Sequence, residues 1–148
     1  GETLMRPLSF YKKAMELQKK YARGRTIDNC IQTNGTMLTD EWCEFFRENN
    51  WLVGVSIDGP QEFHDEYRKN KLGKPSFVKV MQGINLLKKH GVEWNAMAVI
   101  NDFNAVFFRM KTDVISLLLP KIKPEHWLTF QSLRNNGGTF SVLSLTNG

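Results

Sequence analysis

The sequence predicts an α/β fold in which parallel strands alternate with helices. Amphipathic segments and short β-branched runs follow one another from residue 7 to residue 100. The connections between these strands are too long for hairpins, which favours parallel pairing with right-handed crossovers. Periodicity alone leaves two architectures open, a doubly wound sheet and part of a β/α barrel. No Gly-rich dinucleotide fingerprint and no P-loop follows any strand, which counts against a nucleotide-binding Rossmann fold.

Four helices and three strands are expected before residue 101. The helices are Pro7–Arg23, Thr39–Asn50, Gln61–Tyr67 and Ser76–His90. The strands are Thr26–Thr33, Trp51–Ile57 and Val92–Ile100. Gly24 is typical of a helix end, and Thr39 and Ser76 are typical N-cap residues. The first helix is expected to bury an apolar stripe made of Leu8, Tyr11, Met15 and Leu17.

Composition places the chain among ordinary globular proteins. It has 148 residues, of which 41% are hydrophobic, and a net charge of +5. The lysines of the first helix fit a solvated face better than a phosphate-binding patch, so no nucleic-acid partner is predicted. No apolar run is long enough for a membrane span, and Gly1–Arg6 shows no secretory signal. A cytoplasmic location is therefore expected.

The two cysteines, Cys30 and Cys43, do not form a metal-binding or redox motif. Their spacing matches neither a metal knuckle nor a thioredoxin-like pair. Without a secretory context, both are expected to be reduced, partly buried thiols. The sequence thus predicts no metal ligand.

Polar residues gather where the predicted strands end. The three clusters are Gln32-Thr33-Asn34-Gly35, Ser56-Ile57-Asp58-Gly59-Pro60 and Asn101-Asp102. Each cluster taken alone is ordinary turn chemistry. Because binding groups of parallel β/α folds gather at the carboxyl ends of strands, three clusters at one edge favour a ligand site.

A set of motifs in order resembles the radical S-adenosylmethionine family, and especially its anaerobic sulfatase-maturating branch. The set comprises Gly1-Glu2-Thr3-Leu4, Gln32-Thr33-Asn34-Gly35, Val55-Ser56-Ile57-Asp58-Gly59-Pro60, and His64-Asp65 with Arg68. The resemblance runs without a break from Gly1 to about Ala105. It implies a partial β/α barrel of the radical SAM type, in which the three strands correspond to about the third to fifth strands of the barrel.

The resemblance also implies roles for individual residues. Gly1 and Glu2 match the end of a Gly-Gly-Glu segment that binds the amino group of S-adenosylmethionine. Ser56 and Arg68 match residues that contact the ribose and carboxylate of that cofactor. Thr33, Asn34 and Asp58 match family positions at the carboxyl ends of strands, near the bound cofactor and the substrate peptide.

The chemistry of these side chains is consistent with such roles. Glu2 offers a negative acceptor for an ammonium group, and Arg68 offers a planar fork for a carboxylate. The hydroxyl of Ser56 suits a ribose hydroxyl. Each has a structural alternative, since Ser56 can cap a turn and Arg68 can belong to a solvated loop. His64 is expected to be a packing or surface residue, outside the site.

The resemblance further implies a 4Fe–4S cluster, which thiolates hold. The family's Cys-x3-Cys-x2-Cys segment corresponds to a position before Gly1, and Cys30 and Cys43 do not replace it. The family's general-base carboxylate lies beyond the position of Ala105. The printed chain is therefore expected to be inactive by itself and to contain no catalytic residue, although the parent enzyme oxidises a sulfatase Cys or Ser to formylglycine.

Residues 106–148 do not match the family in the expected frame. We interpret residues 1–105 as part of a radical SAM core domain and residues 106–148 as a poorly ordered tail. One hypothesis is that the tail is a frameshift product. The alternative is a divergent helix over about Val106–Leu119 followed by two irregular strands.

Two other functions stay open at this stage. A related radical SAM/SPASM maturase that modifies another peptide shares nearly all of these motifs. A non-catalytic protein-binding module is an alternative of another class, and its partner binding would survive substitution of Ser56 and Arg68. For the first interpretation, the expected partner is a sulfatase polypeptide.

Overall fold

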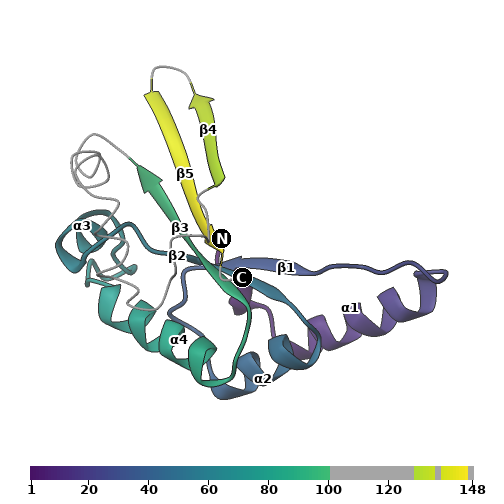
Figure 1. Cartoon of the computed structure of the whole chain (residues 1–148). Coiled ribbons are helices and arrows are strands. Elements are labelled where there is room, and N and C mark those ends of the chain that lie inside the picture. Colours follow the sequence, from purple (N-terminus) through teal and green to yellow (C-terminus); the bar gives the residue numbers. More distant parts are fainter. Residues whose placement is uncertain (101–128, 136–137, 147–148) are drawn as a thin grey trace.

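A computed structural model describes residues 1–100, 129–135 and 138–146 of the chain (Figure 1). The helices are the 3-10 turn η1 Thr3–Met5, then α1 Leu8–Tyr21, α2 Asp40–Glu48, α3 Gln61–Tyr67 and α4 Phe77–Lys89. The strands are β1 Cys30–Thr33, β2 Leu52–Ser56, β3 Trp94–Ile100, β4 Thr129–Asn135 and β5 Gly138–Thr146. The predicted Asn101-Asp102 cluster lies outside the described residues.

The sheet has the strand order β1-β2-β3-β5-β4. The first three strands are parallel, with Ile31 opposite Val53 and Val53 opposite Trp94. The predicted α/β class with parallel strands and flanking helices is confirmed for this part of the chain. β5 then pairs antiparallel with β3, and β4 with β5.

One face of the parallel strands is covered by α1, α2 and α4. Side chains alternate between faces along a strand, so the register places Ile31, Val53 and Trp94 in one row on the same face. These residues belong to the same buried cluster as Phe46 of α2 and Ile84 of α4. Figure 1 shows the three helices along the same side of the strands. We call this the covered face.

The opposite face, which we call the second face, carries Gln32, Gly54, Ser56, Asn95 and Met97. A Cβ atom built on Gly54 lies 2.8 Å from Met97 Sδ, 3.2 Å from Asn95 Oδ1 and 3.4 Å from Gln32 Cγ. Ser56 is opposite Met97 in the register and shares this face. Polar side chains thus accompany a glycine on this side of the sheet.

Several local predictions hold and others need correction. Thr39 caps α2, because its side chain accepts a hydrogen bond from the Trp42 amide. Gly24 lies beyond the end of α1 with a φ of +79°, although the residue directly after the C-cap, Arg23, is also left-handed with a φ of +50°. Leu17, however, is 45% exposed and does not join the apolar stripe of α1. The chain from Thr26 to Asn29 is not a strand, and β1 begins only at Cys30.

The predicted N-cap of α4 is correct in position, but the Ser76 side chain does not make the capping hydrogen bond. Instead, Asp65 Oδ1 accepts from the amides of Ser76, at 3.0 Å, and Phe77, at 2.9 Å. A carboxylate from the preceding helix therefore serves the start of α4, and the Ser76 hydroxyl is left for another partner.

The described part of the tail consists of the β4–β5 hairpin. Its ladder runs from Thr129 opposite Ser144 to Asn135 opposite Gly138. Two strands in this stretch correspond in position to the alternative interpretation of the tail. The proposed domain boundary at residue 105 and the frameshift hypothesis stay predictions.

Candidate functional site

The carboxyl ends of β1, β2 and β3 meet at the same edge of the sheet. This edge, which we call the carboxyl edge, is formed by the ends at Thr33, Ser56 and Ile100. The segments that follow β1 and β2 carry two separate polar clusters. One is built around Glu2 and the other around Asp58 and Arg68.

The Glu2 cluster joins the start of the chain to the end of β1. Glu2 Oε1 accepts a hydrogen bond from Thr33 Oγ1 at 2.6 Å and from the Leu4 amide at 3.1 Å. Glu2 Oε2 accepts from the Asn34 amide at 2.8 Å. The carboxylate is half-buried and has one partner on Oε2, so it retains acceptor capacity at this atom. Gly1 is exposed beside it.

Thr33 and Asn34 serve the loop that follows β1. Thr33 is buried, and its hydroxyl accepts from the Gly35 amide while it donates to Glu2. Asn34 Oδ1 accepts from the amide and the hydroxyl of Thr36. Both residues therefore shape the loop at the carboxyl edge. Their predicted contact with substrate stays a prediction.

Ser56 ends β2 on the second face and is half-buried. Within the described part of the chain, its hydroxyl has no hydrogen-bond partner. A turn-capping role for Ser56 therefore has no support in its geometry. The predicted role as a ligand contact stays a prediction that fits this placement.

Asp58 and Arg68 form an ion pair at the same edge. Arg68 Nε donates to Asp58 Oδ2, and Arg68 Nη2 donates to Asp58 Oδ1 at 3.1 Å. Asp58 Oδ1 also accepts from the Val99 amide of β3 at 2.9 Å. The Asp58 side chain is 7% exposed and that of Arg68 is 27% exposed. Asp58 is thus engaged on both oxygens, while the guanidinium keeps a solvent-facing portion with unassigned N–H groups.

His64 is completely buried under this pair, contrary to a surface position. Its Nδ1 accepts from the Asp58 amide at 3.3 Å, and its Nε2 lies 3.0 Å from Ser76 Oγ. Burial lowers the pKa of His64, and Arg68 lowers it further, whereas Asp58 and Asp65 raise it. The imidazole is accordingly neutral at physiological pH.

The structure brings Gly1, Glu2, Ser56 and Arg68 to one edge of one sheet. Glu2 reaches the end of β1, Ser56 ends β2, and Arg68 is tied to β3 through Asp58 and Val99. Sequence reasoning missed the participation of His64, Asp65 and Ser76. The run His64-Asp65 followed by Arg68 was a signal, but only folding shows that Ser76 completes it.

The described residues do not fit a cluster or metal site. Within them, no group of three His, Cys, Asp or Glu side chains is arranged to hold a metal ion. Cys30 is exposed on β1, contrary to the expected partial burial, and Cys43 is fully buried in α2. Burial, followed by the charge of Asp40, raises the pKa of Cys43 to about 11, which disfavours the thiolate that iron needs.

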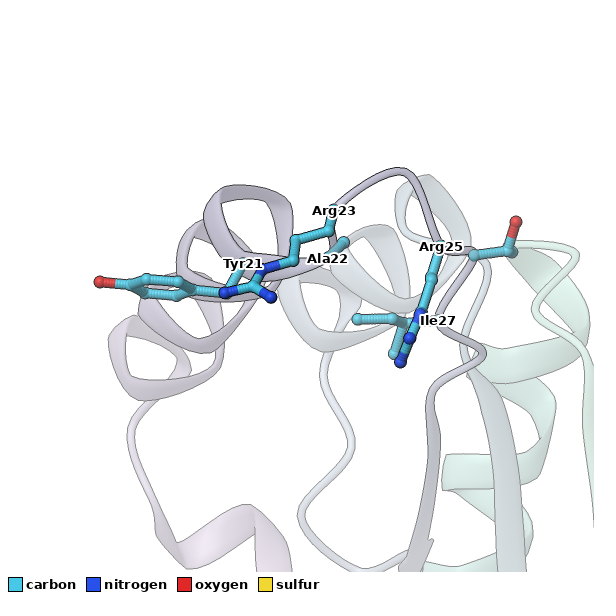
Figure 2. Close-up of a pocket in the computed structure, with 6 residues that line it drawn as sticks. Tyr21, Ala22, Arg23, Arg25 and Ile27 are labelled. Atoms are coloured by element: carbon cyan, nitrogen blue, oxygen red, sulfur yellow. The ribbon is translucent and has the colours of Figure 1, made fainter.

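A hollow of about 450 Å³ lies away from this edge. It is lined by residues 21–23 and 25–27, where the chain leaves α1 and approaches the amino end of β1 (Figure 2). Tyr21, Arg23 and Arg25 are exposed there. This position is at the opposite end of β1 from Glu2, so the hollow is separate from the candidate site.

The family model of the radical SAM superfamily matches residues 1–106. The chain belongs to the radical SAM superfamily. The match includes the whole parallel sheet and both polar clusters of the carboxyl edge. Among the described residues of this radical SAM chain, no helix combines the length and apolar character that crossing a membrane requires.

The curated relatives include anaerobic sulfatase-maturating enzymes of two types. A serine-type enzyme of Bacteroides thetaiotaomicron is 95% identical over 107 residues, covering 72% of this chain and 26% of the relative. A serine-type enzyme of Klebsiella aerogenes is 38% identical over 139 residues, covering 93% of this chain and 33% of the relative. A cysteine-type enzyme of Clostridium perfringens is 42% identical over 106 residues, covering 71% and 29%.

A solved structure agrees with this relationship. The structure titled native anSMEcpe with bound AdoMet and Cp18Cys peptide has a TM-score of 0.75 and 37% identity. It covers 80% of this chain and 33% of that protein. The radical SAM chain described here therefore spans about a quarter to a third of the length of the relatives it matches.

Proposed function

We propose that this chain is the S-adenosylmethionine-binding part of an anaerobic sulfatase-maturating enzyme. Such an enzyme oxidises an active-site Cys or Ser of a sulfatase polypeptide to formylglycine, and we place it in the cytoplasm. The relatives that carry this name, at 95% and 38% identity, support the proposal. The observation that carries it is that the Glu2 carboxylate and the partly exposed Arg68 guanidinium, which Asp58 holds, lie at one carboxyl edge.

The two clusters suit the two charged ends of an amino acid. Glu2 retains an acceptor position on Oε2 for an ammonium group, with the Asn34 amide on the same atom. The solvent-facing part of the Arg68 guanidinium suits a carboxylate, and the hydroxyl of Ser56 suits a ribose. When bound, S-adenosylmethionine supplies a sulfonium that this family cleaves reductively to abstract hydrogen from a substrate.

The cluster that the family uses is not assigned to residues of this chain. Cys30 and Cys43 lie on different elements, one exposed and one buried, and do not fit a shared iron–sulfur group. The role proposed for these residues is therefore to bind and orient the cofactor. Electron transfer and proton abstraction are outside the proposal for this chain.

Calorimetric titration of the full chain with S-adenosylmethionine tests the proposal. Glu2→Gln keeps the shape of the side chain but removes its charge, and we expect affinity to fall about tenfold. Arg68→Lys keeps the charge but loses the planar fork, and a similar loss is expected. Arg25→Ala removes an exposed charge at the opposite end of β1 and is the matched control, with affinity unchanged.

The same titration separates the rival functions. Absence of S-adenosylmethionine binding by the folded chain contradicts the proposal. Partner binding that survives Ser56→Ala and Arg68→Lys indicates the protein-binding module instead. For the parent enzyme, mass spectrometry of sulfatase-derived and unrelated peptides separates formylglycine formation from another SPASM-type peptide modification.

We also propose that residues 106–148 form a tail read from a neighbouring frame. The family match ends at residue 106, and the relative at 95% identity aligns over only 107 residues. A divergent segment instead predicts alignments that continue, as the 139-residue alignment with the Klebsiella aerogenes relative does. Sequencing of the source DNA decides, since an uninterrupted family-like alternate frame supports the frameshift and its absence ends the idea.

A further inference from the structure

A closed ring of hydrogen bonds joins Asp58, His64, Ser76 and Arg68, and it includes both the backbone and the side chain of Arg68. The Asp58 amide donates to His64 Nδ1, and His64 Nε2 contacts Ser76 Oγ. Ser76 Oγ donates to the Arg68 carbonyl oxygen at 2.6 Å, and the Arg68 guanidinium returns to the Asp58 carboxylate. The ring thus joins the end of β2, the end of α3 and the start of α4.

The directions of these hydrogen bonds fix the tautomer of His64. A backbone amide can only donate, so His64 Nδ1 is the acceptor and carries no proton. Nε2 therefore carries the proton and donates to Ser76 Oγ, whose own proton goes to the Arg68 carbonyl oxygen. A second proton on the ring would set Nδ1–H against the Asp58 N–H, which opens the ring.

The position and burial of these residues indicate that the ring holds the Arg68 side chain in place. His64 is 0% exposed, whereas the Arg68 side chain that it supports indirectly is 27% exposed. A long side chain at a partly open edge loses rotamer entropy when it binds a ligand, unless its surroundings already hold it. Asp58 holds the guanidinium, and His64 and Ser76 hold the backbone on both sides of that pair.

We propose that His64 is a positioning residue that acts through Asp58 and Ser76 to hold Arg68 ready for the carboxylate of a bound ligand. The proposal rests on the function proposed above for the identity of that ligand. The ring itself does not rest on it, because its hydrogen bonds join residues of this chain alone.

Nitrogen NMR of histidine-labelled full chain provides the first test. We expect His64 to keep an unprotonated Nδ1 and a protonated Nε2 at neutral pH, and to take up a second proton only below the ordinary pKa of histidine, because burial lowers its pKa. Of the charged groups that face it, Asp58 and Asp65 raise this pKa, and Arg68 lowers it. The opposite tautomer, or titration near the ordinary value for histidine, overturns the proposal.

Three variants provide the second test, read by S-adenosylmethionine affinity and by exchange of the Arg68 Nε–H proton. His64→Phe keeps a ring of similar size without hydrogen bonds, and we expect about tenfold weaker affinity and about tenfold faster exchange. His64→Asn places an acceptor near the Nδ1 position, and we expect it to restore part of the affinity and part of the protection of Arg68 Nε–H from exchange. Phe77→Leu alters the ring that packs on His64, with centroids 5.7 Å apart, and leaves both readouts unchanged.

The outcomes separate this proposal from the proposed function. Equal effects of His64→Phe and Phe77→Leu on affinity and exchange reduce His64 to a packing residue and overturn the positioning role. If the unmodified chain binds no S-adenosylmethionine, the proposed function fails, and the exchange of Arg68 Nε–H still decides whether His64 orders Arg68. If His64→Phe does not fold, the His64→Asn variant and the tautomer measurement decide.

Discussion

The two faces of the parallel sheet differ in what their side chains do. On the covered face, Ile31, Val53 and Val55 are buried against helices in one apolar cluster. On the second face, Gln32 is exposed and Ser56 and Met97 are half-buried, whereas Gly54 and the polar Asn95 are buried. The difference indicates that the apolar covered face maintains the fold, whereas polar, partly exposed side chains such as Ser56 lie on the second face.

The division also explains the place of the charged groups. Glu2 and the Asp58–Arg68 pair lie at the carboxyl edge, where the strands end. Substitutions on the covered face should therefore lower stability with no separate effect on affinity. Substitutions of polar residues on the second face should lower ligand affinity with little effect on stability.

Phe46→Ala on the covered side should have the largest effect. Phe46 is fully buried and stacks on Trp42, with ring centroids 5.5 Å apart. Its truncation leaves a cavity, and we expect a loss of about 3–5 kcal/mol in the free energy of unfolding. Denaturant unfolding followed by tryptophan fluorescence measures it, and a loss below about 1 kcal/mol contradicts the packing described.

Gly83→Ala in α4 should rank next. A Cβ atom at this position comes 2.2 Å from the Gly35 carbonyl oxygen, which is backbone and cannot rotate away. We expect a loss of about 3 kcal/mol, at the upper end of overpacking costs, in chemical denaturation. Lys79→Ala on the exposed side of the same helix is the control and should change stability by less than about 0.5 kcal/mol. Equal stability of the two variants would show that α4 does not press on Gly35.

Ser56→Ala on the second face should reverse this pattern. We expect stability to change by less than about 0.5 kcal/mol, because the hydroxyl has no partner among the described residues. Affinity for S-adenosylmethionine should fall about fivefold through the loss of one hydrogen bond. Thermal unfolding and calorimetry on the same sample test both halves. Unchanged affinity removes Ser56 from the site.

The smallest expected effect concerns a contact between two of the covering helices. Asp40 Oδ1 lies 2.6 Å from both Lys89 Nζ and His90 Nε2, and these hydrogen bonds lower the Asp40 pKa to about 2. A carboxyl with a lowered folded-state pKa stabilises the fold above its ordinary value of 3.8. This contribution is lost as pH falls from about 4 to about 2.

Asp40→Asn isolates this contribution. The variant should be slightly less stable than the original chain near pH 7, and the difference should vanish near pH 2. The group is exposed, so the effect is small and sensitive to salt. Thermal unfolding at several pH values measures it, and a difference that stays constant with pH excludes this ion pair as its cause.

The order of the elements was predictable from sequence because each depends on local patterns. Gln61–Tyr67 was predicted with the bounds that α3 has, and Thr39 was identified as the cap of α2. The parallel arrangement followed from the lengths of the connections. Thr26–Asn29 was wrongly placed in a strand, because alternation along a sequence does not reveal whether a neighbouring strand extends far enough to pair.

The site was predictable in its residues more than in its contacts. The motifs selected Glu2 and Ser56 at strand ends and Arg68 in a downstream loop, and the fold brings all three to one edge. That Asp58 occupies the fork of Arg68, or that Asp65 caps α4, depends on side chains from different elements meeting in space. No periodicity within a single segment encodes such meetings.

Helix α4 touches both halves of the carboxyl edge. Near its middle, Gly83 abuts the loop that carries Asn34, and at its start Ser76 holds the backbone of Arg68. One helix therefore contacts both the Glu2 cluster and the Asp58–Arg68 pair, and its position helps to set the spacing between them. A small tilt of α4 would change the distance between Glu2 and Arg68. Mutations in this helix, far from any ligand atom, can therefore change which ligand the carboxyl edge binds.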